Sequence, residues 1–340
     1  MGNPASKAGV PRPTIAVYGG AGHTGRFVVR ELSQRGFPAI AIGRDADRLA
    51  AADLPSGVRR AVAGLDDPGA LDRTLRGASA LINCAGPFLD TAEPLIEAAL
   101  RAGVPYLDVT AEQASAQAAF DRYGAAAEAA GVAIVPAMGF YGGLGDLLVT
   151  AALGDWPRAD EARIAIALDS WKPTEGTRAT GRRNTARRLT ISDGRLQPLA
   201  DPAPHAVWPF AAPFGDQDVV ELPFTETILI GRHLQVRELR AYLATAPLAD
   251  LRDPKTPPPA PADTSGRSAQ TFRVEVEVRQ GGQIRRAAAQ GRDIYAVTGP
   301  LVAEAAERVL RRDGPGGVFA PGALFDARDF LAALAPDLGA

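Results

Sequence analysis

Residues 14–26 read TIAVYGGAGHTGR, a short apolar run followed at once by a glycine-rich segment. The apolar run predicts a buried strand, and glycines spaced three residues apart predict a tight turn that opens a helix. The free N–H groups and the macrodipole at the start of a helix favour negative charge, so this turn suits a pyrophosphate. The same spacing also occurs in strand-to-helix turns that bind nothing. The residues predicted to contact a dinucleotide are Gly19, Gly22, His23, Thr24 and Gly25.

The next predicted strand, residues 38–43, indicates which dinucleotide is bound. An amphipathic helix separates it from the first strand, as in one βαβ unit. In a Rossmann fold the residue at the tip of this strand faces the adenosine ribose, where an acid favours NAD and an arginine accommodates the 2′-phosphate of NADP. Arg44 takes that place, with Arg48 one helical turn further on. We therefore predict NADP(H); the alternative is that both arginines are solvated surface charges, partly neutralised by Asp45 and Asp47.

The composition is that of an ordinary globular protein. The chain has 340 residues, 46% of them hydrophobic, and a net charge of −2, which gives no bulk attraction to nucleic acid or to a membrane surface. It has no run of about 18 apolar residues, and residues 1–13 lack the apolar stretch of a signal peptide and predict a disordered tail. Cys84 is the single cysteine, so no disulfide can form within the chain. We expect a cytoplasmic protein without a nucleic-acid or membrane partner.

The alternation of strands and helices continues to residue 137. Further strands are predicted at 58–65, 80–86, 105–110 and 132–137, with helices at 68–76, 91–102 and 115–130. The segment 80–86 is apolar on both faces, as are strands buried in a parallel sheet. Six strands alternating with helices predict a doubly wound α/β sheet.

The pattern changes near Gly139. A helix at 146–153 and a strand at 162–168 precede short strands, with hairpin turns at 192–194 and 281–282 and an irregular proline-rich loop at 253–268. Two helices follow, at 298–311 and 326–334. The predicted fold is therefore α/β: a doubly wound Rossmann domain, residues 14–144 plus about 291–340, interrupted by a mixed α+β domain with a largely antiparallel sheet, residues 145–290.

Several segments together carry a resemblance to a known family. GGAGHTGR at 19–26, NCAGPF at 83–88, YLDVTAE at 106–112 and GRDIYAVT at 291–298 resemble the saccharopine dehydrogenase-like reductases. The resemblance covers most of the chain but is thin over 155–270. It implies an NADP-binding Rossmann domain interrupted by a domain whose sheet helps form the substrate cleft and often a dimer, so a homodimer is expected. The family includes imine reductases and trans-acting enoyl reductases, so the resemblance indicates the cofactor more closely than the substrate.

This chain departs from the family pattern in two places near the expected cleft. Ala111 stands before Glu112 where many relatives have glycine, and residues 141–146 read YGGLGD where relatives often have Asp, Ser and Pro. The substrate pocket is therefore expected to be individual to this chain.

In a doubly wound sheet the ligand lies beyond the carboxyl ends of the strands. This rule brings the segments 83–88, 108–112 and 139–146 around one cleft. We expect Phe88 to shield the nicotinamide ring from water and to contribute to substrate binding. The residues expected to line the cofactor are Asn83, Ala85, Gly86 and Pro87; the alternative is that this segment is only a strand-ending turn.

Hydride transfer needs the reacting carbons held close together and a source of a proton. The catalytic candidates are Tyr141, Asp108 and Lys172. Tyr141 lies in a glycine-rich loop, and its phenol suits proton donation if its pKa is lowered. Asp108 would equally cap a turn, and Lys172 would equally lie in a surface turn.

Four further residues are candidates for binding the substrate. Arg178 and Arg182 lie one helical turn apart, and the arginine fork suits a carboxylate; the alternative is a solvated helix face. Glu112 and Asp146 complete the set, although each also fits as a first-turn acid that stabilises a helix. The three histidines lack zinc spacing, so no metal is predicted.

The function predicted from the sequence is an NADPH-dependent reductase that transfers hydride to a C=N bond or an activated C=C bond of a small or carrier-bound metabolite, in a bacterial biosynthetic pathway. No tyrosine has a lysine four residues later, which excludes the short-chain dehydrogenase pair. The arginine segment favours a C=N substrate with a carboxylate, whereas an apolar groove formed by Trp208, Phe210 and Phe214 would favour an acyl substrate. Because no acid–base pair is unmistakable, a non-catalytic NADP-binding regulator remains the alternative.

Overall fold

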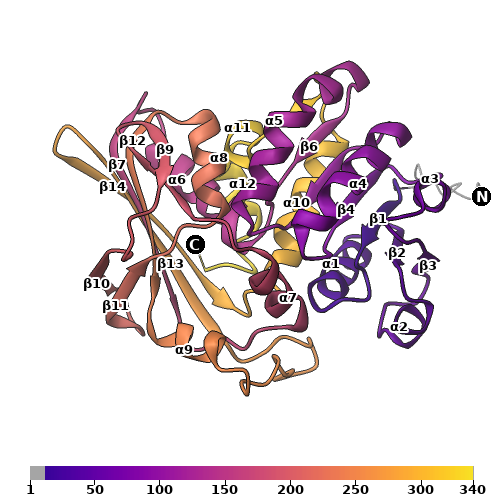
Figure 1. Ribbon diagram of the computed structural model, residues 1–340, viewed down its shortest axis with the longest axis horizontal. Coiled ribbons are helices and arrows are strands. Elements are labelled where there is room, and N and C mark those ends of the chain that lie inside the picture. Colours follow the sequence, from indigo (N-terminus) through magenta and orange to yellow (C-terminus); the bar gives the residue numbers. More distant parts are fainter. Residues whose placement is uncertain (1–11, 340) are drawn as a thin grey trace, which may run out of the picture.

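The computed structural model describes residues 12–339, which form two β-sheets with helices around and between them (Figure 1). The first sheet lies on the right in Figure 1 and the second on the left. Most of the predicted N-terminal tail, residues 1–11, lies outside the described residues.

The first sheet is the doubly wound parallel sheet that the sequence predicts. Each of its strand pairs is parallel. Its seven strands lie in the order β15 (Gly317–Val318), β6 (Ala133–Val135), β5 (Tyr106–Asp108), β4 (Ala80–Asn83), β1 (Ile15–Tyr18), β2 (Ala39–Gly43) and β3 (Arg59–Val62). The strand order reverses beside β1, which is the switch point where ligands bind in such sheets.

Alternate residues of the central strands face two helical layers. Ile15 and Val17 pack in one core with α1 and α10, whereas Ala16 and Tyr18 pack in the other with α3, α4 and α5. Both faces are therefore covered, as expected for strands that are apolar throughout. The helices of this part are α1 (His23–Gln34), α2 (Ala46–Ala51), α3 (Pro68–Leu75), α4 (Phe88–Ala102), α5 (Gln113–Ala130), α10 (Thr298–Leu310), α11 (Pro321–Leu324) and α12 (Ala327–Ala333).

The strand β15 was not predicted. Its two residues pair with Ala133 and Ile134 of β6 and extend the sheet at its edge. They follow the segment DGPGG at 313–317, whose glycines and proline indicate a loop. Only pairing with a strand far away in the sequence makes this segment extended.

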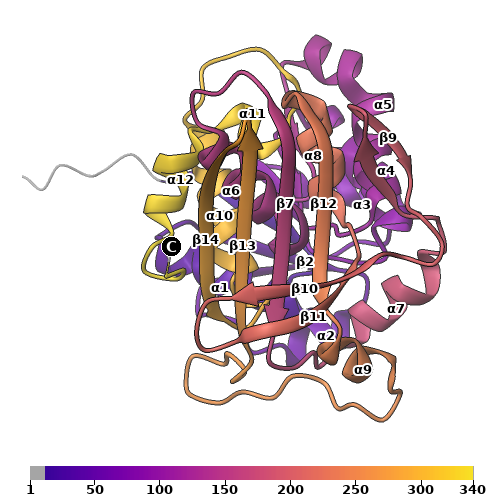
Figure 2. The same ribbon diagram turned by 90° about the vertical axis from the view of Figure 1, so that its left-hand side faces the viewer.

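The second sheet is mixed and largely antiparallel, as predicted. Its main path runs in the order β10 (His205–Phe210), β11 (Gly215–Glu221), β12 (Val236–Ala244), β7 (Ala159–Leu168), β13 (Thr271–Gln280) and β14 (Gln283–Arg292), and the hairpin of β8 (Leu189–Ser192) and β9 (Arg195–Pro198) completes its eight strands. Only β12 and β7 pair in parallel within this sheet. Figure 2 shows the long strands side by side, with β10 and β11 crossing in front of them.

The second part also contains two helices in a region predicted to hold only strands. They are α8 (Thr225–His233) and α9 (Ala246–Arg252). The run TILI at 227–230 has the β-branched character of a strand, but α8 is buried on most of its surface and tertiary packing overrides that propensity. The predicted loop at 253–268 has no helix or strand.

Two helices lie near the boundary between the sheets. An irregular helical turn at Phe140–Leu144 leads into α6 (Gly145–Leu153), which packs against β13 and β14. The helix α7 (Glu175–Arg183) has no buried residue and lies across the lower part of the molecule between the two sheets (Figure 1).

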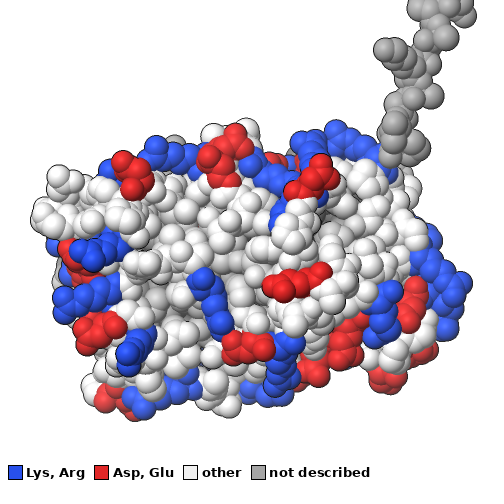
Figure 3. Space-filling model, turned by 90° about the horizontal axis from the view of Figure 1, so that it is seen from above, with Lys and Arg blue, Asp and Glu red and all other residues white. Residues whose placement is uncertain are grey.

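The face shown in Figure 3 carries no broad field of one charge. On the face shown in Figure 3, charges of both signs lie mostly near the margins, around a wide uncharged area. Within residues 12–339, no helix has the length and apolar character needed to cross a membrane.

Candidate active site

The glycine turn forms a close backbone contact that leaves the start of α1 open. A Cβ atom added at Gly25 would lie 2.1 Å from the carbonyl oxygen of Gly19, and Gly19 itself has φ +78°. The N–H of Gly22 donates to that same carbonyl at 2.8 Å. No side chain caps α1 and no acid lies in its first turn, so its first N–H groups are available to an anion.

His23 and Thr24 lie in the first turn of α1, beside this opening. Thr24 lines the cavity described below. The Nε2 atom of His23 is buried without a hydrogen-bond partner, and burial lowers the pKa of its imidazole. The turn thus combines unused helix donors with an unpartnered polar side chain, which fits the phosphates of a dinucleotide.

Arg44 lies immediately after β2 and is exposed. Its neighbour Arg48 instead approaches Glu175 of α7, at 3.5 Å between Nη2 and Oε2. Among residues 12–339, Arg44 has no ion-pair partner, so its guanidinium is available to a phosphate at the tip of β2.

The loop after β4 is held by its own side chains. Asn83 donates from Nδ2 to the hydroxyls of Thr91 (3.0 Å) and Tyr106 (3.2 Å), and its Oδ1 accepts from the N–H of Ala85 at 2.9 Å. The side chain of Asn83 is therefore turned inward and does not line the cavity. Gly86 does line it, and an added Cβ there would lie 2.7 Å from the Thr180 hydroxyl of α7. Pro87 follows Gly86 and directly precedes α4.

Asp108 lies in the same inward network and does not line the cavity. Its Oδ1 accepts from the N–H groups of Thr110 (3.0 Å) and Ala137 (2.8 Å), and its Oδ2 accepts from the Tyr106 hydroxyl at 3.0 Å. Burial raises the pKa of its carboxyl group to about 6, although these hydrogen bonds act in the opposite direction. Ala137 has φ +60° and leads into the turn that carries Tyr141, so Asp108 acts on the site by holding that turn.

Glu112 and Asp146 are likewise engaged away from the cavity. The carboxylate of Glu112 accepts from the N–H groups of Phe88 (2.6 Å) and Leu89 (3.1 Å), so it caps α4 rather than the helix that follows it in sequence. Asp146 is fully buried and bonds to His233 Nε2 and to the N–H of Gly322, both at 2.7 Å. The structure thus gives both acids partners within the protein fold.

Lys172 is exposed and lies beside a separate cavity of about 260 Å³. Its side chain is not among those that line the main cavity.

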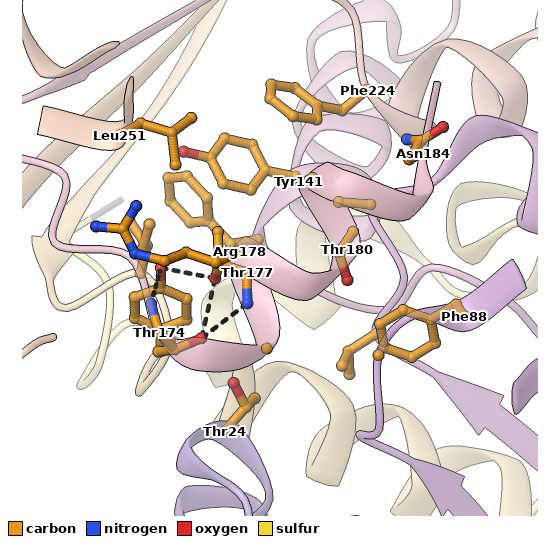
Figure 4. Close-up of a pocket in the computed structure, with 18 of the residues that line it drawn as sticks. Thr24, Phe88, Tyr141, Thr174, Thr177, Arg178, Thr180, Asn184, Phe224 and Leu251 are labelled. Atoms are coloured by element: carbon orange, nitrogen blue, oxygen red, sulfur yellow. Dashed lines mark hydrogen bonds between the residues drawn. The ribbon is translucent and has the colours of Figure 1, made fainter. Parts of the chain in front are cut away.

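The main cavity lies between the two sheets and has a volume of about 590 Å³. Thr24, Gly86 and Phe88 contribute from the first part of the chain, while α7 contributes Thr177, Thr180 and its neighbours. Figure 4 shows Thr24 and Phe88 on one side of α7, with Tyr141, Phe224 and Leu251 on the other. A cavity of this size fits a small organic ligand.

An aromatic stack forms one wall of the cavity. The ring of Tyr141 stacks on Phe224 at 4.3 Å and on Trp171 at 5.3 Å between centroids. The Tyr141 hydroxyl is buried without a partner, and burial raises the pKa of this phenol well above its ordinary value. The sequence argument required a lowered pKa; the structure instead keeps Tyr141 protonated.

A second tyrosine, Tyr295, holds the start of α7 in place. Its hydroxyl accepts from Trp171 Nε1 at 3.2 Å and lies 3.0 Å from the Thr177 hydroxyl. Burial raises its pKa as well. Sequence reasoning did not select Tyr295 or Trp171, although Tyr295 stands within the GRDIYAVT segment and could have been noticed there.

The arginines near α7 differ in their partners. Arg178 lines the cavity, but its Nη2 donates to the carbonyls of Asp253 and Thr256, which fastens the 253–268 loop to α7. Arg182 also lines the cavity and is exposed. Arg188 lies beyond the end of α7, immediately before β8, and also lines the cavity.

These observations define the chemistry that the cavity can support. Its titratable side chains besides arginine are Cys84, Tyr141 and Tyr295, and burial raises the pKa of each, so all three remain protonated near neutral pH. No aspartate or glutamate is among the lining residues. The part of the chain that the structure describes holds no cluster of His, Cys, Asp or Glu suited to a metal ion. The cavity can therefore donate protons and attract negative charge.

Comparison with known proteins agrees with this arrangement. Residues 15–135 match the family model of the saccharopine dehydrogenase NADP-binding domain. A probable mitochondrial saccharopine dehydrogenase-like oxidoreductase of Arabidopsis thaliana is 31% identical over 156 residues, which are 41% of this chain and 34% of the relative. A trans-acting enoyl reductase of Mycobacterium ulcerans is 32% identical over 133 residues, 37% of this chain and 32% of the relative. The chain thus aligns with about a third of the length of these curated relatives.

A solved structure extends the likeness to the whole fold. The saccharopine dehydrogenase (L-Glu forming) of Saccharomyces cerevisiae superposes with a TM-score of 0.69 over 95% of this chain and 97% of the yeast chain, at 12% sequence identity. The two chains share the Rossmann sheet and the additional mixed sheet.

Proposed function

We propose that the chain is an NADPH-dependent reductase that transfers hydride to a polarised double bond, because residues 15–135 match the saccharopine dehydrogenase NADP-binding domain. The observation that carries this proposal is the cavity of about 590 Å³ that meets the glycine turn and the β4 loop beside the switch point of the sheet. A reactive carbon of a nicotinamide held by that turn would face the space that the substrate fills.

The chain offers a specific set of contacts to NADPH. The first N–H groups of α1 would hold the pyrophosphate, and Arg44 would hold the 2′-phosphate. Thr24 and Gly86 would lie nearer the nicotinamide, because both line the cavity. When bound, the cofactor supplies the hydride.

The protonation state of the cavity favours reduction over oxidation. Oxidation of an alcohol or amine needs a base to accept a proton, whereas the raised pKa values of Cys84, Tyr141 and Tyr295 keep these groups as proton donors. The unpartnered hydroxyl of Tyr141 is the group we propose to donate to the substrate once the aromatic stack adjusts. Asp108 serves as a positioning residue for the turn that carries Tyr141.

The charge of the cavity also bears on the bond that is reduced. Three arginines and no carboxylate line it, so it disfavours a cationic iminium and favours a neutral or anionic acceptor. We therefore propose an activated C=C bond conjugated to a carbonyl in preference to the C=N bond favoured by sequence. The aromatic residues that support an acyl substrate are Tyr141, Phe224 and Trp171. Trp208, Phe210 and Phe214 instead pack together in a separate cluster with β7 residues.

The experiment is stopped-flow or steady-state NADPH oxidation with matched substrates. Cinnamaldehyde, a cyclic imine and a simple ketone would be supplied to the purified protein, with NADPH and NADH compared for each. Oxidation of NADPH by the conjugated C=C substrate alone supports the proposal. Activity confined to the imine would overturn the choice of bond, and failure of either nucleotide to bind would refute the cofactor site.

The alternative from another class is a non-catalytic NADP-binding regulator. The observation in its favour is that the cavity lining holds no carboxylate, histidine or lysine to act as an ordinary acid or base. It predicts NADPH binding in calorimetry without cofactor oxidation by any member of the panel.

The remaining parts of the proposal concern the setting of the protein. We propose residues 14–144 plus about 291–340 as the cofactor domain and 145–290 as the substrate and dimerisation domain. The proposed protein is a cytoplasmic homodimer in a bacterial biosynthetic pathway, acting on a small or carrier-bound metabolite. Light scattering after size exclusion distinguishes a dimer from a monomer.

A further inference from the structure

Arg188 lies between two cavities and lines both. Besides the main cavity, a smaller one of about 150 Å³ is bordered by polar side chains that include Gln113 and Gln117. Arg188 and Asn184 are the residues that the two cavities share. A ligand in the main cavity would thus meet a guanidinium and an amide where the small polar cavity begins.

The guanidinium of Arg188 has few of its donors engaged. Its Nη1 donates to the carbonyl of Pro223 at 2.6 Å, and the group lies over the Phe224 ring at 4.5 Å from the centroid. Within residues 12–339, no carboxylate forms an ion pair with it. This differs from Arg183, which pairs with Asp90 at 2.9 Å, and from Arg178, which is fastened to loop carbonyls.

The nearest acid does not neutralise Arg188. Glu226 is buried, and one of its oxygens accepts from the N–H of Phe224 at 2.7 Å. Burial raises the pKa of Glu226 to about 7, so near neutral pH much of this group carries no charge. Burial also lowers the pKa of Arg188.

A partly buried cation without a counter-ion is costly unless a ligand supplies the missing charge. We propose that Arg188 is the anion-binding residue of this site and that the substrate carries a carboxylate on an apolar body, with the carboxylate at Arg188 and the reacting bond toward Gly86. The inference rests on the proposed function for the identity of the reacting end. The binding of the carboxylate end is independent of any reaction.

The apolar body of the substrate would lie along the cavity between these two points. The aromatic wall and Val109, Leu251 and Ile294 line this space and offer no charged acceptor. Arg182 stands at the exposed rim, where water screens its charge and its contribution to binding is small.

The test compares a carboxylate with its neutral analogue on the protein saturated with NADP⁺. The probes are 3-phenylpropanoate and 3-phenylpropanamide, which share one apolar body, and the readout is the dissociation constant from calorimetry or ligand-observed NMR. We expect the wild type to bind the acid more tightly. The variant Arg188→Gln should weaken binding of the acid by about 10- to 100-fold, because a hydrogen bond to a charged group is lost. It should change the affinity for the amide by less than 2-fold.

Two further variants separate charge from structure. Arg188→Lys keeps the charge without the fork and should retain part of the preference for the acid. Arg183→Gln removes a cation of α7 outside the cavity and should leave both probes unchanged. Equal binding of acid and amide by the wild type would overturn the proposal, as would an equal loss of both probes in Arg188→Gln.

If Arg188→Gln does not fold, as judged by circular dichroism, the wild-type comparison and Arg188→Lys still decide the matter. NADPH oxidation by uncharged cinnamaldehyde is measured separately. Its absence would count against the proposed reductase but not against the anion site, whereas a lost acid preference in an active enzyme would count against the anion site alone.

Discussion

Gly25→Ala tests whether the glycine turn is a rigid cofactor cradle. A Cβ at this position would lie 2.1 Å from the oxygen of Gly19, 2.8 Å from its carbonyl carbon and 2.9 Å from Cα of Gly20. All three atoms belong to the backbone, so no side chain can rotate away to relieve the overlap. Forcing extra atoms into a packed site costs about 1–3 kcal/mol. We expect the variant to lose about that much stability.

The same displacement should weaken cofactor binding. The turn would move away from the start of α1, where the pyrophosphate is proposed to bind, and a misplacement worth 1–3 kcal/mol corresponds to about a 5- to 150-fold loss of affinity. The assays are urea denaturation for the free energy of unfolding and calorimetric titration with NADPH for affinity.

Gly124→Ala is the matched control. Gly124 lies within α5, and a Cβ there would have no heavy atom within 4 Å. Removing a glycine from a helix interior should stabilise the protein by about 0.5–1 kcal/mol and leave NADPH affinity unchanged. If Gly25→Ala matched Gly124→Ala in both measurements, the argument from backbone contact would be refuted.

Three other changes test the site. Arg44→Ala should reduce NADPH affinity by about 10- to 100-fold while leaving NADH affinity within 2-fold, as measured by calorimetry, because a charge-assisted bond to the 2′-phosphate is lost; an equal effect on both nucleotides would contradict this role. Asp108 has a folded-state pKa raised from 3.8 to about 6, so the folded protein binds its proton more tightly than the unfolded chain, and its contribution to stability falls by up to about 3 kcal/mol as pH rises through that window. Urea denaturation at pH 4 and pH 7 should show this fall reduced in Asp108→Asn, and an unchanged pH dependence would argue against the raised pKa. Tyr141→Phe removes a buried hydroxyl without a partner, so thermal unfolding should show stability kept or raised by about 1 kcal/mol, while kcat for the conjugated C=C substrate should fall; unchanged kcat would remove Tyr141 as the donor.

The parallel sheet was predictable because its signals are local. The apolar runs and the spacing of Gly19, Gly22 and Gly25 depend only on neighbouring residues, and they determine a strand, a turn and a helix in sequence order. The two predicted hairpins follow from turn residues at Asp193-Gly194 and Gly281-Gly282 in the same way. Pairing over long distances, as in β15, carries no such local signal.

The roles of polar residues were less predictable because their partners lie far away in the sequence. Glu112 precedes α5 and was read as an acid of that helix, but its carboxylate caps α4, which starts 24 residues earlier. Asp146 was a candidate for binding the substrate, but its carboxylate forms a hydrogen bond with His233, which lies 87 residues later. In the sequence, an acid that binds a ligand or its own helix looks the same as an acid that bonds to a distant part of the protein. Only the fold determines which partner lies opposite the carboxylate.

The arginines in and after α7 show the same limit of prediction from sequence. In sequence these residues form one basic segment, whereas the structure separates them by partner: Arg178 holds the loop, Arg183 pairs with Asp90, and Arg188 remains without a carboxylate. Arg188, which was not among the substrate-binding candidates from the sequence, therefore lines the cavity with a charge that is available to a ligand.

The return of the chain to the first sheet has a consequence for synthesis on the ribosome. The helix α1 packs against α10, Arg35 of α1 pairs with Glu304 and Glu307 of α10, and β15 covers the edge of β6. These partners follow the entire second sheet in the sequence. While the ribosome is still translating, the nascent nucleotide-binding unit exposes one apolar helix face and one open strand edge, so the emerging chain is vulnerable to aggregation until residues after Arg292 have left the exit tunnel.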